Sequence, residues 1–251
     1  MLQYSKTIGK KEFTEMVDAK KKISYCNIIN VKITARQLVG IEISNCYFEN
    51  VEIANVDLQG VQITDSRFYL VRFKNCKFDK TVFSSLTFWA VSFDYCKFTR
   101  SNITRINAIE EIGFTKCKFN SVSFKESKLY TVYFTMCKLY QCNFHGADLT
   151  YTHFLGTSIT QGNFTNACVS KIGDSPIQFI ELPLGYHGCN LVYNVTNDIV
   201  YVQESWDTDK MLSLSQFKKY TAKFYKPYKD GSYSIRYYKY LIAIQLFELG
   251  C

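Results

Sequence analysis

The sequence has few of the residues on which enzyme catalysis usually depends. It contains three histidines, His145, His153 and His187, spread over different segments. No glycine-rich phosphate loop, no HExxH zinc motif and no CxxC pair occurs in the chain. A nucleophilic cysteine needs a base and an oxyanion site, and the pattern around His187 and Cys189 offers neither. We therefore expect a protein that is not an enzyme and that has no cofactor and no metal site.

Long apolar runs are also absent. No stretch reaches the roughly eighteen consecutive apolar residues that indicate a transmembrane helix. The N-terminal segment carries Lys10, Lys11 and the run from Lys20 to Lys22, with no apolar core of the kind found in a secretory signal. We expect no membrane association and a place in the cytosol, either of a bacterium or of a host cell.

What the sequence does contain is a large apolar residue at every fifth position. The series of these centres begins at Ile28 and ends at Val169, with one slip where Phe114 follows Ala108 by six positions. Another small or apolar residue, beginning with Cys26, usually stands two positions before each centre. A period of five fits neither a helix nor a strand. It indicates stacked repeats that bury a shared core.

This pattern resembles the pentapeptide-repeat family, whose consensus is Ala, then Asp or Asn, then Leu, followed by two variable residues. Ala147, Asp148 and Leu149 reproduce that consensus, although most units here place Cys or Val two positions before Phe. The resemblance covers Cys26 to about residue 170. It implies a mainly β chain folded as a right-handed quadrilateral β-helix, with four units per coil and about seven coils.

Three segments follow from this reading. Residues 1–24 form an N-terminal helical cap, because residues 8–22 can place Phe13, Met16 and Val17 on one side of a helix. Residues 25–171 form the β-helix. Residues 172–251 follow a turn signal at Gly173 to Pro176 and form a small α+β domain. In it we expect strands over 185–195 and 198–203 and helices from about Leu212 and over 234–249. This domain either caps the open end of the rod or docks a partner.

Most of the cysteines also occur at a fixed position of the five-residue repeat. Seven of the ten fall on the inward position two before a centre: Cys26, Cys46, Cys76, Cys96, Cys117, Cys137 and Cys142. A buried free cysteine behaves as a small hydrophobic residue, and the cytosol keeps thiols reduced. We interpret these seven as core residues.

In a recurring Cys-Lys-Phe tripeptide, Cys and Phe are expected to point into the core and Lys to point toward solvent. Four units per coil place residues about twenty apart on one face of the rod. One such ladder reads Gln37, Asp57, Lys77, Lys97, Lys118, Lys138, Ser158. Lys80, Arg100 and Lys116 are expected near the edges of the same face. The ladder is either a solvated stripe that discourages edge pairing or a flat basic strip that receives an anionic surface.

Charge decides between the partners that the family suggests. Some pentapeptide-repeat proteins resemble a DNA duplex and occupy the DNA-binding saddle of type II topoisomerases such as gyrase, which requires an acidic surface. This chain has a net charge of +8. The preferred function is therefore a protein-binding scaffold or inhibitor whose partner has an acidic surface. A topoisomerase-binding protector or inhibitor is the alternative, and nucleic-acid binding is the third reading, since most aromatic residues occupy inward centres.

Composition and the C-terminal segment add two further expectations. The chain is rich in Lys, Asn, Tyr and Phe, which fits an AT-rich genome and a phage or effector protein that acts on a host protein. Tyr233, Tyr237, Tyr238 and Tyr240 crowd one segment, and tyrosine is enriched at interfaces. A homodimer or a partner contact through the C-terminal domain is therefore a second candidate interface.

Overall fold

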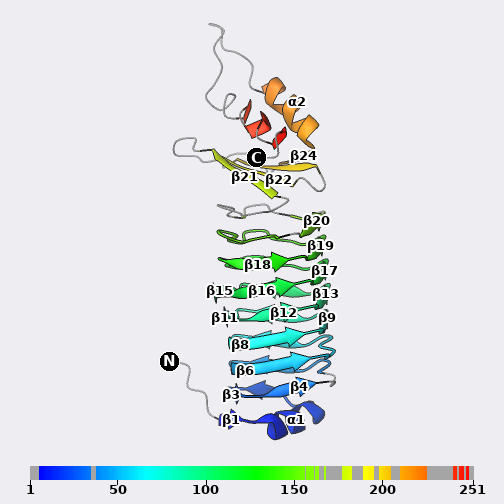
Figure 1. Cartoon of the computed structure of the whole chain (residues 1–251), viewed down its shortest axis with the longest axis vertical. Coiled ribbons are helices and arrows are strands. Elements are labelled where there is room, and N and C mark those ends of the chain that lie inside the picture. Colours follow the sequence, from blue (N-terminus) through cyan, green and yellow to red (C-terminus); the bar gives the residue numbers. More distant parts are fainter. Residues whose placement is uncertain are drawn as a thin grey trace.

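The computed structural model describes residues 6–34, 38–155, 157–160, 162–163, 167, 177–182, 189–194, 198–204, 210–224, 240–241, 243–245 and 247–248. The chain forms a tall stack of coils with helix α1 (Lys10–Asp18) at one end and an antiparallel sheet with helix α2 (Leu214–Phe224) at the other (Figure 1). Within the described ranges no helix is long and apolar enough to cross a membrane.

Each coil has four sides, and strands on the same side of successive coils pair in parallel with a register of about twenty residues, such as Val82 with Asn102. We number the faces in the order in which the chain visits them. Face 1 contains β1 (Lys6–Ile8), β3 (Cys26–Ile29), the first halves of β6 (Tyr47–Ala54) and β8 (Arg67–Lys74), β11 (Thr87–Trp89) and β15 (Asn107–Glu110). Face 2 contains β4 (Lys32–Thr34), the second halves of β6 and β8, β12 (Ser92–Asp94), β16 (Ile112–Thr115) and β18 (Val132–Thr135).

The other two faces are built in the same way. Face 3 contains β9 (Lys77–Asp79), β13 (Lys97–Thr99), β17 (Lys118–Asn120), β19 (Lys138–Tyr140) and β20 (Ser158–Thr160). Face 4 contains β2 (Ile23–Ser24), β5 (Glu42–Ser44), β7 (Gln62–Thr64), β10 (Val82–Ser84) and β14 (Asn102–Thr104). Faces 1 and 3 therefore lie on opposite sides of the rod, as do faces 2 and 4.

The β-helix inferred from the period is confirmed, and it begins earlier than expected. Coils 1 to 8 are numbered by the centre that each places on face 1: Ile8, Ile28, Phe48, Phe68, Phe88, Ala108, Leu129 and Leu149. This face has one layer more than the seven or so predicted, because β1 pairs with β3 ahead of Cys26. Helix α1 covers this end of the core with Phe13 and Val17, which are buried.

The corners explain why the repeat has five residues. Between one strand and the next, a single residue adopts the left-handed conformation, with φ near +50°, as at Asn55 (57°) and Asn75 (51°). Asparagine tolerates this conformation better than most residues other than glycine. The side-chain amide of Asn75 also donates to the Asn55 side-chain oxygen in the coil below at 2.7 Å. One corner residue and one short extended side together complete each unit.

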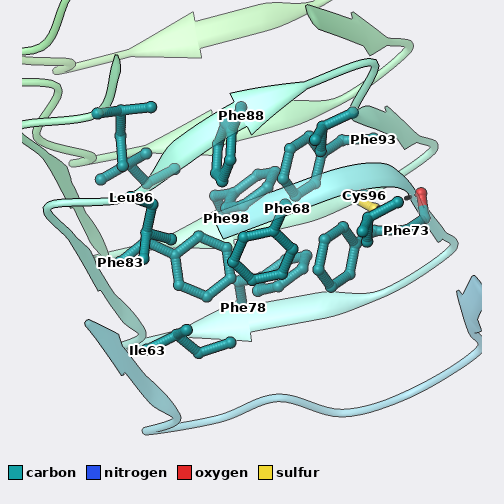
Figure 2. Close-up of a cluster of buried hydrophobic side chains, with 14 of the residues drawn as sticks. Ile63, Phe68, Phe73, Phe78, Phe83, Leu86, Phe88, Phe93, Cys96 and Phe98 are labelled. Atoms are coloured by element: carbon teal, nitrogen blue, oxygen red, sulfur yellow. Dashed lines mark hydrogen bonds between the residues drawn. The ribbon is translucent and has the colours of Figure 1, made fainter. Parts of the chain in front are cut away.

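The large centres point inward and stack in columns (Figure 2). Phe73, Phe93 and Phe114 follow one another with ring centroids 4.8 Å apart and planes within 11° of parallel. Rings of neighbouring columns meet nearly edge on, as do Phe93 and Phe98 at 5.6 Å and 65°. The stacked pairs follow from the coil spacing of ~4.8 Å, which places identical side chains directly above one another.

The inward position two before each centre carries a second regularity. Its side chain donates a hydrogen bond to the carbonyl oxygen of a centre in the coil below, as Thr81 does to Leu58 at 2.9 Å and Ser101 to Phe78 at 3.0 Å. The thiol of Cys76 does the same to Ile53 at 3.2 Å. All seven inward cysteines are free and buried, as predicted. Burial raises the pKa of Cys46 to about 11, so the Cys46 thiol stays protonated at neutral pH and can donate.

The single slip in the period is a β-bulge. Phe88 pairs with Ala108, and the next pair is Trp89 with Glu110, so Ile109 is the extra residue in β15. A bulge of this kind adds a residue to one strand while the pairing resumes beyond it. The following centre, Phe114, consequently returns to the inward column above Phe93.

The C-terminal part combines a sheet and helices, as expected, but its sheet is larger than predicted. Four antiparallel strands follow in order: β21 (Ile177–Leu182), β22 (Cys189–Asn194), β23 (Ile199–Glu204) and β24 (Lys210–Leu212). Only β22 and β23 fall where strands were expected. Helix α2 begins at Leu214, where Ser213 and Gln216 exchange the two hydrogen bonds of a capping box at 2.8 and 3.1 Å.

The tyrosine interface of the C-terminal segment is not supported at its one described position. Tyr240 is fully buried in a cluster with Phe217 and Phe247, and its ring lies 5.3 Å from that of Phe217. Tyr240 is therefore a core residue, and its prediction as an interface residue was wrong. Tyr233, Tyr237 and Tyr238 lie outside the described residues.

Candidate functional site

Face 3 brings the four predicted lysines into one straight ladder. Lys77, Lys97, Lys118 and Lys138 are the first residues of β9, β13, β17 and β19, and each is the direct register partner of the next. The following residue in each strand is a buried centre, so alternation along the strand turns the lysine to solvent. Four consecutive coils thus place an exposed lysine above a lysine.

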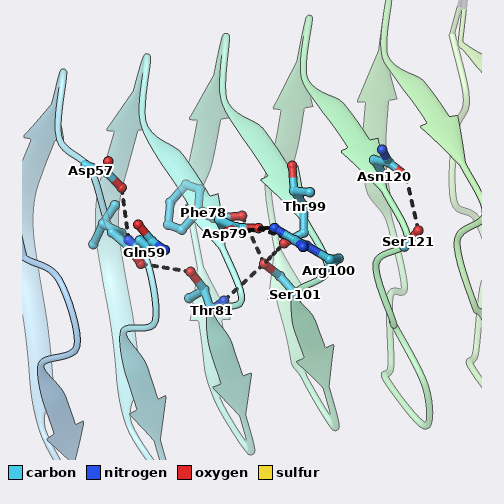
Figure 3. Close-up of polar contacts among 11 residues, drawn as sticks. Asp57, Gln59, Phe78, Asp79, Thr81, Thr99, Arg100, Ser101, Asn120 and Ser121 are labelled. Carbon is cyan, nitrogen blue, oxygen red and sulfur yellow. Dashed lines mark hydrogen bonds and ion pairs between the residues drawn. The ribbon is translucent and has the colours of Figure 1, made fainter.

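The ladder is bounded at both ends by residues that carry no positive charge. Asp57 pairs with Lys77 at the lower end, and Ser158 pairs with Lys138 at the upper end. Asp57 is turned toward its own strand, because its carboxylate accepts a hydrogen bond from the backbone N–H of Gln59 at 3.1 Å (Figure 3). Gln37, which the sequence placed below Asp57, lies outside the described residues.

The lysines of the ladder make no ion pair, in contrast to two basic residues on face 2. Lys32 pairs with Glu52 at 3.2 Å, and Arg72 with Asp94 at 3.6 Å, each between neighbouring coils. None of the four ladder lysines makes an ion pair with any residue that the structure describes. Like charges on adjacent strands repel. The repulsion is screened by salt and would be relieved by an anionic partner.

The three basic residues predicted at the edges of this face have different surroundings. Arg100 contacts both carboxylate oxygens of Asp79 in the coil below, at 2.9 and 3.0 Å (Figure 3). The ammonium group of Lys116 lies 5.4 Å from the centre of the Tyr95 ring. Lys80 is an exposed corner residue with φ of 53°. The charge of Arg100 is thus largely compensated, whereas Lys80 adds to that of the ladder.

A shallow depression of about 220 Å³ lies between coils 4 and 5 of this face. Lys77, Lys97, Thr99, Asp79 and Arg100 line it, together with the edge of a buried phenylalanine. Two ammonium groups and a hydroxyl can all donate hydrogen bonds to a carboxylate. The arrangement suits a single acidic side chain from a partner better than it suits an enclosed small molecule.

The two histidines that the structure describes lie on different faces. His145 follows Asn143 on face 4, whereas His153 lies on face 2, across the rod, with its ring stacked on Tyr133 at 4.8 Å. His187 lies outside the described residues. In the part of the chain that the structure describes, no group of three His, Cys, Asp or Glu residues could hold a metal ion.

The structure also shows an exposed surface that the sequence analysis missed. Leu70, Trp89, Ile109 and Tyr130 lie on or beside face 1 with 42 to 49% of each side chain exposed. These residues occupy the position after a centre, the adjoining corner or the bulge, whereas the ladders predicted from the sequence contain only the position before each centre. Sorting the position after each centre would have found Trp89 and Tyr130.

Comparison with known proteins supports the repeat assignment. Residues 137–171 match the family model for pentapeptide repeats, in eight copies. No curated protein matches the chain. Among solved structures, a trypsin-treated form of QnrB1, a plasmid-mediated fluoroquinolone resistance protein, has 16% identity and a TM-score of 0.42, and the match covers 66% of this chain and 81% of that one.

Two cyanobacterial pentapeptide-repeat proteins are similar over a comparable share of the chain. HetL from Nostoc sp. strain PCC 7120, which is involved in heterocyst differentiation regulation, has 12% identity and a TM-score of 0.26, with 64% of this chain and 94% of that one covered. Rfr23 from Cyanothece 51142 has 9% identity and a TM-score of 0.30, with 64% of this chain and 99% of that one covered.

Proposed function

The chain is a pentapeptide-repeat protein, and we propose that it is a non-enzymatic scaffold whose face 3 binds an acidic surface of a protein partner. This proposal rests on the ladder of Lys77, Lys97, Lys118 and Lys138, in which no lysine makes an ion pair with a described residue. We propose the cytosol as its place of action and a host protein as its target. We propose that residues 25–171 form the rod that binds the partner, that residues 1–24 close its lower end with β1 and α1, and that residues 172–251 are a separate C-terminal domain.

The rigidity of the rod favours such a role. The four lysines start from one flat parallel sheet with a rise of ~4.8 Å per coil, so they span about 15 Å along the rod. A partner meets backbone positions that are already fixed, and only lysine side chains must be ordered on binding. Complementary charge raises the association rate and excludes partners of the wrong sign more than it adds to affinity.

A pair of charge-reversal variants with equal net charge tests the proposal. Lys97→Glu with Lys118→Glu changes the ladder. Lys74→Glu with Lys125→Glu makes the same change of charge on faces 2 and 4 and is the matched control. We expect the ladder variant to lose capture of the partner from a lysate of the native host, with an unchanged denaturation midpoint, and the control to retain it. Equal capture by both variants would contradict the proposal.

Nucleic-acid binding is a second candidate, because Tyr140 is 43% exposed on face 3, two residues from Lys138. Stacking on bases together with phosphate contacts is how proteins hold single strands. Among the described residues of face 3 only Tyr140 offers this, since the Tyr95 ring at the corner is occupied by Lys116. A gel shift across a salt series separates the two functions, because phosphate contacts weaken steeply with salt. A topoisomerase contact by DNA mimicry is disfavoured by the positive charge of this face, and a gyrase supercoiling assay tests it.

A further inference from the structure

The apolar residues exposed on face 1 gather about its middle coil. Trp89 lies on coil 5 and is 44% exposed, with Leu70 on coil 4, Ile109 on coil 6 and Tyr130 on coil 7 around it. The Tyr69 ring packs against Trp89 at 6.1 Å, nearly at right angles. We name Leu70, Trp89, Ile109 and Tyr130 the apolar strip. Tryptophan and tyrosine are the residues that dominate protein interfaces.

Five charged residues on face 1, and on the corner that leads from it to face 2, are arranged around the strip in a particular order. Coil 3 carries Glu49, coil 4 carries Arg67, coil 6 carries Glu110 and Glu111, and coil 7 carries Lys128. None of these five side chains makes a hydrogen bond or an ion pair with another described residue. Coil 5, with Thr87, Trp89 and Ala90, carries no charge.

This order reverses sign about coil 5. One step away, a positive residue on coil 4 is matched by two negative residues on coil 6. Two steps away, a negative residue on coil 3 is matched by a positive residue on coil 7. A two-fold contact between identical surfaces brings residue i of one copy to residue j of the other and the reverse. Two antiparallel rods centred on coil 5 therefore set opposite charges against each other between coils 4 and 6 and between coils 3 and 7. Asp65 and Arg105, at the other corner of face 1 on coils 4 and 6, are also opposite in charge, whereas Asp148 on coil 8 meets the uncharged coil 2.

We propose that face 1 is a self-association surface on which a second copy of this chain docks antiparallel, with Trp89 next to the two-fold axis. Arg67 then faces the coil that carries Glu110 and Glu111 in the second copy, and Lys128 faces the coil that carries Glu49. The long arginine and lysine side chains reach across the width of one face. Parallel rods are excluded, because they would set the glutamates of coil 6 against the same glutamates.

This contact leaves the site of the proposed function accessible. Face 3 lies across the rod from face 1, so a pair of rods presents its two lysine ladders outward on opposite sides. Face 1 is narrow, and the contact lies at the low end of interface sizes, which makes a weak and concentration-dependent dimer the expectation. Loss of dimerisation and loss of partner capture are separate measurements on separate faces.

Sedimentation equilibrium of the full chain tests the proposal. We expect the wild type to dimerise at tens of micromolar, and Trp89→Glu to raise the dimer dissociation constant at least ~tenfold. Tyr140→Glu is the matched control, since Tyr140 holds the same position in its unit on face 3 and is 43% exposed against 44% for Trp89. Its dissociation constant should equal that of the wild type. A monomeric wild type at ~200 μM, or a dimer that Trp89→Glu leaves intact, would overturn the proposal.

Charge reversal within face 1 provides a test that does not depend on the fold of the Trp89 variant. Arg67→Glu alone should weaken the dimer at least ~fivefold, because it sets a glutamate against Glu110 and Glu111 of the second copy. Adding Glu110→Arg and Glu111→Arg to Arg67→Glu restores opposite charges and should return the dissociation constant to within ~threefold of the wild type. A triple variant that is no tighter than Arg67→Glu would contradict the antiparallel arrangement.

Discussion

Arg100 in coil 5 reaches down to Asp79 in coil 4 and contacts both oxygens of its carboxylate, at 2.9 and 3.0 Å. The pair lies at the edge of the face on which Lys77 and Lys97 have no acidic partner among the described residues. Arg100 therefore differs from the lysines with which its sequence position grouped it. The charge of Arg100 is compensated by a carboxylate of the neighbouring coil, whereas the charges of Lys77 and Lys97 are not and can interact with a partner.

From this pair we predict that Arg100→Gln reduces partner capture much less than Lys97→Gln does. The guanidinium is exposed, with 60% of the Arg100 side chain accessible, so the ion pair adds less than about 1 kcal/mol to stability. Capture assays and urea midpoints on the two variants measure both effects. A larger loss of capture in Arg100→Gln than in Lys97→Gln would show that the interface is centred on the corner and not on the ladder.

The inward hydroxyls predict a stability effect confined to the core. Ser101 donates to the Phe78 carbonyl at 3.0 Å and accepts from the backbone N–H of Thr81 at 3.2 Å. Ser101→Ala leaves that buried N–H without its partner and should cost about 1 to 3 kcal/mol of unfolding free energy. Ser85→Ala, at an exposed corner with φ of 56°, is the control and should change it by less than about 0.5 kcal/mol. Equal midpoints for the two variants in urea would show that the inward hydrogen bond adds nothing.

The phenylalanine columns predict a larger effect. Phe93 stacks on Phe73 and Phe114 and is fully buried, so Phe93→Ala should destabilise the rod by about 3 to 5 kcal/mol through the cavity it leaves. Phe93→Leu should cost markedly less, because leucine already serves as a centre at Leu139. Equilibrium unfolding of the two variants checks the order, and a Leu variant as unstable as the Ala variant would show that the rings stabilise by stacking, not by volume.

The buried thiols predict that the rod loses stability at alkaline pH. Burial raises the pKa of Cys46 to about 11 from its ordinary value of 9.0. The folded state therefore keeps a proton that the unfolded state releases, so stability is complete below about pH 9 and falls as pH rises toward 11. Urea midpoints at a series of pH values, in reducing buffer, should show this decline. Cys46→Ser should flatten part of it, since Ser66 already occupies the inward position above Cys46.

Most of the fold could be predicted because every five-residue unit repeats the same pattern of inward and outward positions. The period located the inward centres, and twenty-residue spacing correctly placed Lys77 above Lys97 without any structure. Two features could not be predicted from the repeat because they are not periodic. The entry strand Lys6–Ile8 lies outside the repeat yet pairs with Cys26–Ile29, and the sign reversal about Trp89 appears only when charges on several coils are compared. The ion pair of Arg100 could not be predicted, because its partner, Asp79, lies one coil away in a different unit.

Site-specific cross-linking of the captured partner shows whether the lysine ladder is the surface that binds it. A photoreactive residue is placed at Thr99 on face 3 and, as the control, at Thr104, which holds the same position in its unit on face 4. We expect adducts from Thr99 to a segment of the partner rich in aspartate and glutamate, and none from Thr104. Adducts from Thr104 alone, or from Thr99 to a segment without acidic residues, would contradict the claim that the lysine ladder binds an acidic protein surface.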